Sequence, residues 1–131
     1  MSRFVSADPS DEFFWRSGGD GTLRFLGCNS CGRIHHPPVP RCPYCGSREV
    51  APRAVSGRAT VATYTVSRQS FMPGFEAPYV IAIVEIDDDP TIRLTTNIVG
   101  CEIDDVHIGM AVEVTFEESG EWFVPLFTPR P

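Results

Sequence analysis

The stretch "CNSCGRIHHPPVPRCPYC" (residues 28–45) holds four of the chain's five cysteines, in two Cys-x-x-Cys pairs. Four thiolates suit a tetrahedral metal ion, and two short loops can approach one ion from opposite sides. Gly32 and Gly46 each follow the second cysteine of a pair, where a glycine with positive φ lets backbone N–H groups point at sulfur. We therefore predict one metal site, with Cys28, Cys31, Cys42 and Cys45 as its ligands.

The type of metal follows from the ligands and from their number. A thioredoxin-like redox pair needs only one Cys-x-x-Cys motif, and two motifs in a reducing compartment favour metal over disulfides. Zinc is expected, while iron, which takes the same ligands, stays open. Four cysteines close the coordination shell, so the zinc is expected to be structural rather than catalytic. We expect His35 and His36 to face solvent in the intervening hairpin.

Composition limits where the protein works and what it binds. The chain has 131 residues, contains no apolar run of transmembrane length and begins without a signal-like segment. We therefore expect a cytoplasmic protein that does not enter the membrane. Residues 1–53 carry seven arginines against five acidic residues, whereas residues 54–131 carry four against twelve. The acidic second part would repel nucleic acid, while the arginines of the first part could hold a few phosphates.

Residues 59–127 read as five short strands separated by turn-forming residues. The predicted strands cover residues 59–66, 79–86, 91–99, 111–116 and 121–127. Five strands without a long helix indicate a small barrel, usually an OB-fold, although an SH3-like barrel or a small sandwich also fits. We predict a mainly β protein with an N-terminal helical segment at 1–20, a metal-binding ribbon at 21–53 and a barrel at 54–131.

Shorter features complete the predicted organisation. Ser10 can begin a short helix that Gly18 and Gly19 end. Residues 22–28 form a strand, residues 32–42 return in extended form because of their prolines, and residues 46–57 form a linker.

Two sets of aromatic side chains are expected to be covered, either by the protein itself or by another molecule. Phe13, Phe14 and Trp15 on the predicted helix cover either the protein's own core or a partner. Phe71 and Phe75 belong to a long loop, where they either close the barrel mouth or contact a ligand or partner.

We see no catalytic constellation in the sequence. Cys101 is a lone cysteine at a strand end, a position typical of a small buried side chain. Glu85 and the three aspartates at 87–89 form an acidic run at a turn, typical of a solvated surface. No phosphate-binding loop, serine elbow or second metal motif is present. The residues thus describe a metal-stabilised β protein without catalytic apparatus of its own.

The order of motifs resembles one known family. The motifs are "FFW", "CNSCG", "PPVPRCPYCGS", "SGRATVATYTV", "PYVIAIVEI", "NIVG", "IGMAVEVTF" and "PLFTP". They resemble, over about residues 10–129, the bacterial and archaeal acyl-CoA-associated proteins in which a rubredoxin-like zinc ribbon precedes an OB-fold. That family was long catalogued as a domain of unknown function.

The resemblance implies an accessory role rather than catalysis. Members are typically encoded beside thiolase-like enzymes and form complexes with them. These enzymes are thiolases, hydroxymethylglutaryl-CoA synthases, acyltransferases and the aldolases of steroid side-chain degradation, and some members are fused to or paired with hydratases. The expected partner is a thiolase-like subunit in a two-plus-two assembly that acts on acyl-CoA in lipid or steroid degradation.

The resemblance gives a role to the four paired cysteines, and the chemistry of other side chains fits the accessory role. Cys28, Cys31, Cys42 and Cys45 match the ribbon ligands. Arginines in and after the ribbon could contact the phosphates of CoA shared with the partner: Arg33, Arg41, Arg48 and Arg53. The exposed aromatic residues could anchor the partner: Phe13, Phe14, Trp15, Phe71 and Phe75. A single-stranded nucleic-acid binder and an independent acyl-CoA enzyme are the competing hypotheses.

Overall fold

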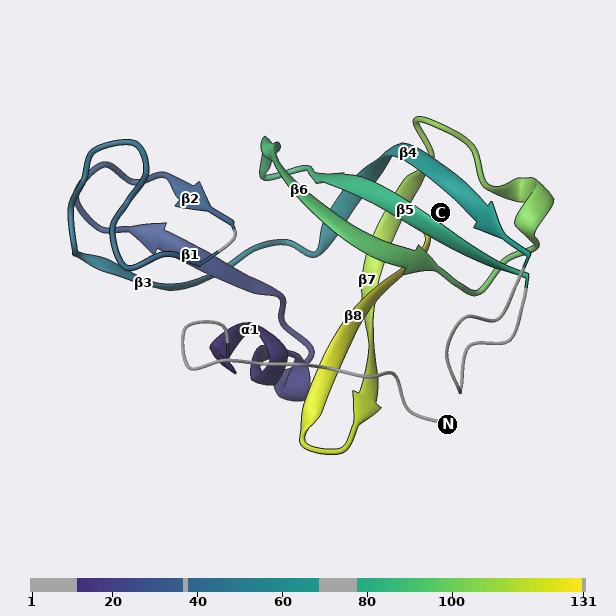
Figure 1. The fold of residues 1–131 in the computed structure, drawn as a ribbon, viewed down its shortest axis with the longest axis horizontal. Coiled ribbons are helices and arrows are strands. Elements are labelled where there is room, and N and C mark those ends of the chain that lie inside the picture. The colour runs from purple at the N-terminus through teal and green to yellow at the C-terminus, as the bar shows by residue number, and fades with distance from the viewer. Residues whose placement is uncertain (1–11, 37, 69–77, 131) are drawn as a thin grey trace.

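The structure is a computed structural model that describes residues 12–36, 38–68 and 78–130. It contains one short helix, a three-stranded sheet and a closed five-stranded barrel. In Figure 1 the small sheet lies at one side of the barrel, and the helix lies near both. The mainly β fold, with one N-terminal helix followed by a cysteine-bearing ribbon and a barrel, confirms the prediction.

The small sheet carries the cysteine pairs. Its strands are β1 (Arg24–Cys28), β2 (Ile34–His35) and β3 (Val50–Ala54), in the order β2-β1-β3 with both pairings antiparallel. The expectation that residues 46–57 form only a linker is wrong for β3. Pro52 hides this strand in the sequence, yet it is tolerated because β3 is an edge strand in which one N–H can be missing.

The barrel strands follow the predicted order. They are β4 (Arg58–Ser67), β5 (Tyr79–Ile86), β6 (Asp89–Ile98), β7 (Ala111–Ser119) and β8 (Trp122–Pro129), arranged as β4-β5-β6-β8-β7 and closed between β7 and β4. All pairings are antiparallel except that of β6 with β8, where Ile98 faces Phe127 in parallel register. This Greek-key order is that of an OB-fold, and one closed barrel excludes the sandwich.

One hydrophobic cluster joins the ribbon to the barrel. In β5 every second residue is buried, as expected for a strand with one face toward a core. The cluster formed by these residues also contains Phe14 of the helix, Phe25 of β1 and Ile34 of β2. The ribbon therefore has no separate apolar core, and its inner face is covered by the barrel.

The N-terminal helix α1 (Glu12–Ser17) continues into a 3₁₀ turn, η1 (Gly18–Asp20). The α-helix ends at Ser17, directly before Gly18 and Gly19 as predicted, and the 3₁₀ turn after it ends at Gly21, whose φ is 80°. Gly18 lacks a side chain for another reason, because a Cβ there would lie 2.3 Å from the Phe116 ring of β7. The other short helical turn, η2 (Ile103–Asp105), precedes β7. Among the described residues, no helix has the length and apolarity needed to cross a bilayer.

Candidate metal centre and its surroundings

The four paired cysteines converge at the tip of the ribbon. Their Sγ atoms all lie within 4.8 Å of one another. The Sγ atoms of Cys28 and Cys45 are 3.6 Å apart, as are those of Cys31 and Cys42. A tetrahedral zinc with Zn–S bonds of about 2.3 Å would place its sulfurs about 3.8 Å apart. The donor set and its spacing therefore fit one four-coordinate metal ion, which would supply a structural cross-link between the two loops.

The backbone of both cysteine loops follows the same pattern. The N–H groups of Gly32 and Gly46 donate hydrogen bonds to the carbonyl oxygens of Cys28 and Cys42, and each bond is 2.9 Å long. Both glycines have the predicted positive φ, 81° and 77°. Backbone N–H groups also point at sulfur. The Cys31 N–H donates to Cys28 Sγ and the Tyr44 N–H donates to Cys42 Sγ, both at 3.4 Å. These donors favour thiolate over thiol, which is the form that binds metal.

The thiols differ in how readily they lose a proton. Backbone hydrogen bonds, first from Cys31 and then from Ser30, lower the pKa of Cys28 to about 6. The Ser47 N–H also lowers the pKa of Cys45, but hydrogen bonding to the Cys28 thiolate, desolvation and the other two sulfurs raise it to about 12. Four negative sulfurs this close together need a cation to balance them. The cluster is therefore built to bind a divalent ion.

Arg53 of β3 holds the first cysteine loop from outside. Its guanidinium donates to the carbonyl oxygens of Gly32 (2.8 Å) and Cys28 (3.2 Å) and reaches Asn29 Oδ1 at 3.5 Å. The guanidinium lies directly over Gly27, and a Cβ added to that glycine would be only 2.6 Å from Arg53 Cζ. Gly27 and Arg53 thus fix the loop that presents Cys28 and Cys31, which the sequence did not indicate.

The other arginines predicted for CoA lie on the surface of the ribbon. Arg33, Arg41 and Arg48 are exposed, and the Arg33 guanidinium stacks 3.7 Å from the centre of the Tyr44 ring. Arg33 and Arg53 line one groove of about 300 Å³ between ribbon and barrel. Its lining also includes Asp88 and Asp89, whose charges oppose the binding of a phosphate in the groove itself.

The aromatic residues predicted to bind a partner fall into different environments. Phe14 is 3% exposed and packs against Phe25 and His36. Phe13 and Trp15 are half-buried against the same cluster. Their exposed parts therefore remain available, whereas the Phe14 ring faces the core. Phe71 and Phe75 lie outside the described residues.

The prediction that both histidines face solvent is wrong for His35. This side chain is 2% exposed, and neither of its ring nitrogens has a hydrogen-bond partner within the described part of the chain. Desolvation lowers the pKa of His35, so the ring is held neutral. The neighbouring His36 is half-buried, with its ring 5.1 Å from that of Phe25. Two consecutive histidines are polar residues, so the sequence alone could not show that other parts of the fold cover these side chains.

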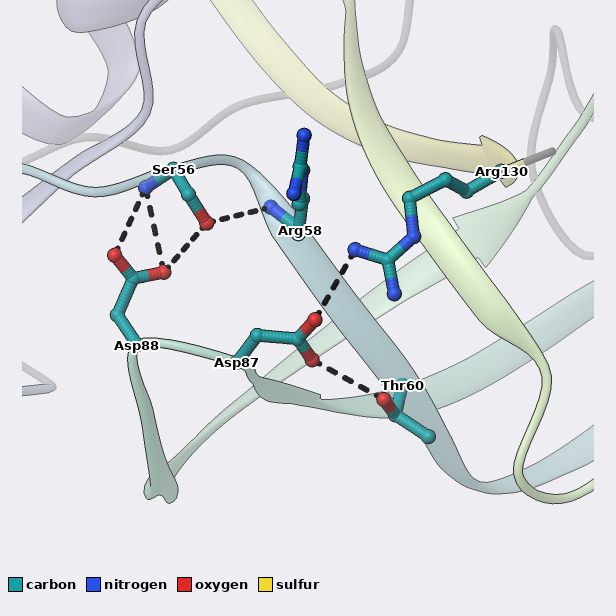
Figure 2. Close-up of polar contacts among 6 residues, drawn as sticks. All are labelled: Ser56, Arg58, Thr60, Asp87, Asp88 and Arg130. Carbon is teal, nitrogen blue, oxygen red and sulfur yellow. Dashed lines mark hydrogen bonds and ion pairs between the residues drawn. The ribbon is translucent and has the colours of Figure 1, made fainter.

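The acidic turn between β5 and β6 connects the linker to the barrel, as Figure 2 shows. Asp88 accepts hydrogen bonds from Ser56 Oγ at 2.7 Å and from the Ser56 N–H at 3.0 Å. Asp87 accepts from Thr60 Oγ1 and from Arg130, each at 3.1 Å. Instead of being merely solvated, as expected, these two carboxylates tie the segment after the ribbon and the end of β8 to one turn.

Cys101 agrees with its predicted character. It is half-buried and packs against the hydrophobic cluster, and burial is the first of the causes that raise its pKa. A raised pKa keeps this thiol protonated and weakly nucleophilic.

Comparison with known proteins matches both parts of the chain to one family. Residues 15–51 match the family model described as "ChsH2, rubredoxin-like zinc ribbon domain". Residues 52–117 match that described as "ChsH2, C-terminal OB-fold domain". The solved structure described as "Ltp2-ChsH2(DUF35) aldolase" is similar at a TM-score of 0.86 and 33% identity, covering 96% of this chain and 98% of that chain.

Relatives of two kinds are similar in sequence. A "Probable enoyl-CoA hydratase alpha subunit" from Thermomonospora curvata is 36% identical over 121 residues, which are 91% of this chain and 37% of the relative. The present chain thus spans less than two-fifths of that relative's length. A "DUF35 domain-containing scaffold protein" from Methanocaldococcus jannaschii is 39% identical over 97 residues, which are 72% of this chain and 67% of the relative. The chain belongs to the ChsH2 (DUF35) family of zinc-ribbon and OB-fold proteins.

Proposed function

We propose that this protein is a non-catalytic accessory subunit that binds an acyl-CoA enzyme and helps to form its acyl-CoA site. The observation that carries the proposal is the similarity, over nearly the whole length of both chains, to a structure described as an aldolase complex. A relative described as a scaffold protein supports the same role. The expected partner is a thiolase-like enzyme, such as a retro-aldolase, in a two-plus-two assembly.

The metal centre has a structural part in this proposal. Cys28, Cys31, Cys42 and Cys45 would hold one zinc, and four protein ligands leave no position for water or substrate. The zinc would stabilise the ribbon tip by joining the two cysteine loops, which the 2.8 Å contact between the Ser30 and Ser47 hydroxyls also links. The chemistry itself, carbon–carbon cleavage of a bulky acyl-CoA such as a steroid side chain, would be supplied by the partner.

CoA contact is proposed for the exposed face of the ribbon. Arg33, Arg41 and Arg48 are exposed and can donate to phosphate oxygens, and the stacked Arg33–Tyr44 pair offers a flat surface. Arg53 is less suited to this role because its guanidinium already binds two backbone carbonyls.

A hydratase partner is the second candidate. It is favoured by the 36% identity to a hydratase alpha subunit, in which this chain would correspond to a part of a longer protein. In that case the accessory role is unchanged, and the partner reaction is hydration instead of cleavage.

Native mass spectrometry of the affinity-purified protein from its own cells tests the proposal. We expect one zinc per chain and a companion subunit of thiolase-like or hydratase-like sequence, which also distinguishes the two candidates. The purified chain alone should show no turnover of acyl-CoA. A zinc-loaded monomer without a companion under all conditions would contradict the proposal.

A further inference from the structure

The outer surface of the barrel strands β4, β5 and β6 carries two rows of uncharged side chains. In one row Thr63, Ile83 and Thr95 lie side by side, and in the next row Thr65, Ile81 and Asn97. On β5 these isoleucines alternate with buried residues, so they point away from the core. We call these six residues the neutral face.

The neutral face contrasts with the next row of the same strands and with the neighbouring strand β7. The next row on the same strands contains Glu85 and Arg93, joined by an ion pair of 3.3 Å. On β7, Glu113 and Glu118 are exposed on either side of Thr115. Charged outward residues are ordinary on a solvated strand and hinder unwanted pairing. Their absence from two adjacent rows of three strands marks a surface that is covered when the protein works.

The neutral face also has a shallow depression. A groove of about 220 Å³ is lined mainly by its residues: Thr63, Tyr64, Thr65, Ile81, Ala82, Ile83 and Thr95. The isoleucines and threonines are β-branched and stiff, so they lose little freedom when a partner binds. The groove has room for one aliphatic or aromatic side chain from another protein.

Charge argues against a second copy as the occupant. Residues 54–131 carry four arginines and twelve acidic residues, a net charge of −8. Two neutral faces could bury only a few hundred Å² against each other, whereas a stable interface buries about 800 Å² from each partner. A pair of copies would therefore have to bring two acidic barrels together, which repel each other.

The structure points to another occupant, and we propose that the neutral face is where the enzyme subunit docks. The matching surface of that subunit is uncharged, presents one protruding apolar side chain and has a rim that is not acidic. The contact is made by side chains, because β5 is already hydrogen-bonded to β4 and β6 on its two sides. This inference rests on the proposed accessory function and adds the surface that performs it.

Photo-crosslinking in the protein's own cells tests the location of the contact. p-Benzoylphenylalanine replaces Thr95 on the neutral face in one variant, and Thr115 on β7 in the matched control. Both positions are exposed threonines in the middle of a barrel strand. We expect the probe at Thr95 to label one enzyme subunit, identified by mass spectrometry as thiolase-like or hydratase-like, and the probe at Thr115 to label none.

Affinity is then measured with the copurified subunit. Thr95→Lys should weaken binding about 100-fold, because it places an unpaired charge in an apolar contact. Thr115→Lys should change binding less than twofold. Equal zinc content and equal melting temperatures show that both variants fold.

The outcomes separate this inference from the proposed function. If an enzyme subunit copurifies but Thr95→Lys binds it as tightly as the wild type and the Thr95 probe does not label it, the docking surface is wrong and the accessory function stands. Labelling of a second copy by the Thr95 probe also overturns the inference. If no enzyme subunit copurifies at all, both the function and the docking surface are wrong.

Discussion

At the scale of single residues, Arg53 shows how a side chain supports a metal site without touching the metal. Its two donors satisfy carbonyl oxygens at the beginning and the end of the first cysteine loop, those of Cys28 and Gly32. Contacts of this outer kind orient the ligands, and their loss weakens metal binding. The glycine beneath the guanidinium is needed for the same reason, because any side chain at Gly27 would displace Arg53.

Replacing this arginine should therefore weaken zinc binding. We expect Arg53→Met to lower zinc affinity about 10-fold to 100-fold, as other outer contacts to metal sites do. Competition with a chromophoric chelator measures the affinity. Arg48→Met is the matched control, since Arg48 is an exposed arginine of the same ribbon, and it should leave the affinity unchanged. Equal affinity in both variants would show that the carbonyl contacts of Arg53 do not orient the ligands.

His35 should make the stability of the protein depend on pH. Burial lowers its pKa in the folded protein below the usual 6.5, so well above pH 6.5 the ring is neutral in both states and its burial is independent of pH. As the pH falls below 6.5, the unfolded chain takes up a proton before the folded protein does, and folding becomes less favourable. We expect the free energy of unfolding of the zinc-loaded protein to fall between pH 6.5 and pH 5.

The variant His35→Leu isolates this contribution. It should show a shallower decline over the same pH range in urea unfolding, while the loss caused by protonation of the cysteine ligands is common to both proteins. Parallel curves for wild type and variant would mean that His35 titrates alike in the folded and unfolded states.

At the scale of elements, the sequence predicted what local patterns control. The alternating or buried runs of β4 to β8 and the two Cys-x-x-Cys loops follow from residues near one another in the chain. β3 was missed because Pro52 and small residues carry no strand signal, and only pairing with β1 makes this segment extended. The neutral face was also missed, since the register of three strands decides which residues share a row. Arg53 could not be assigned to the first loop because 21 to 25 residues separate it from its acceptors.

The turn between β5 and β6 offers a test of how the linker is held. Asp88→Ala removes both acceptors of the Ser56 hydrogen bonds, and we expect a loss of about 1 kcal/mol in the free energy of unfolding. Asp104→Ala changes an exposed aspartate of η2 and should alter the stability by less than about 0.5 kcal/mol. Chemical denaturation of the zinc-loaded proteins measures both. Equal stability would show that solvent replaces the Asp88 contacts without cost.

At the scale of the whole molecule, ribbon and barrel share one apolar interior. Phe25 and Ile34 of the ribbon lie in the same cluster as the barrel residues, including Val84 and Phe127. A protein with one continuous core unfolds in one cooperative step. A metal bound at the ribbon tip should thus stabilise the barrel as well as the ribbon.

Removal of zinc should lower the melting temperature of the whole protein. With a strong chelator and a reductant present, we expect one transition at a lower temperature, because the ribbon strands, which share the hydrophobic cluster with the barrel, lose their cross-link. Far-ultraviolet circular dichroism follows the strands of both parts, and the fluorescence of Trp15 on α1 and Trp122 on β8 follows the helix and the barrel. Two separate transitions, with the barrel unaffected, would show that the ribbon does not contribute to the common core.

The closure of the barrel also sets the order in which the chain can fold as it is made. β4, β5 and β6 are neighbours in sequence and can pair as soon as each has left the ribosome. The parallel contact between Ile98 and Phe127 must wait until residue 127 has also left the ribosome. Until then β6 has a free edge and the inner side chains of β5 are exposed, a state prone to aggregation. We expect nascent chains that end before β8 to require a chaperone, and release from it to follow the emergence of β8 from the ribosome.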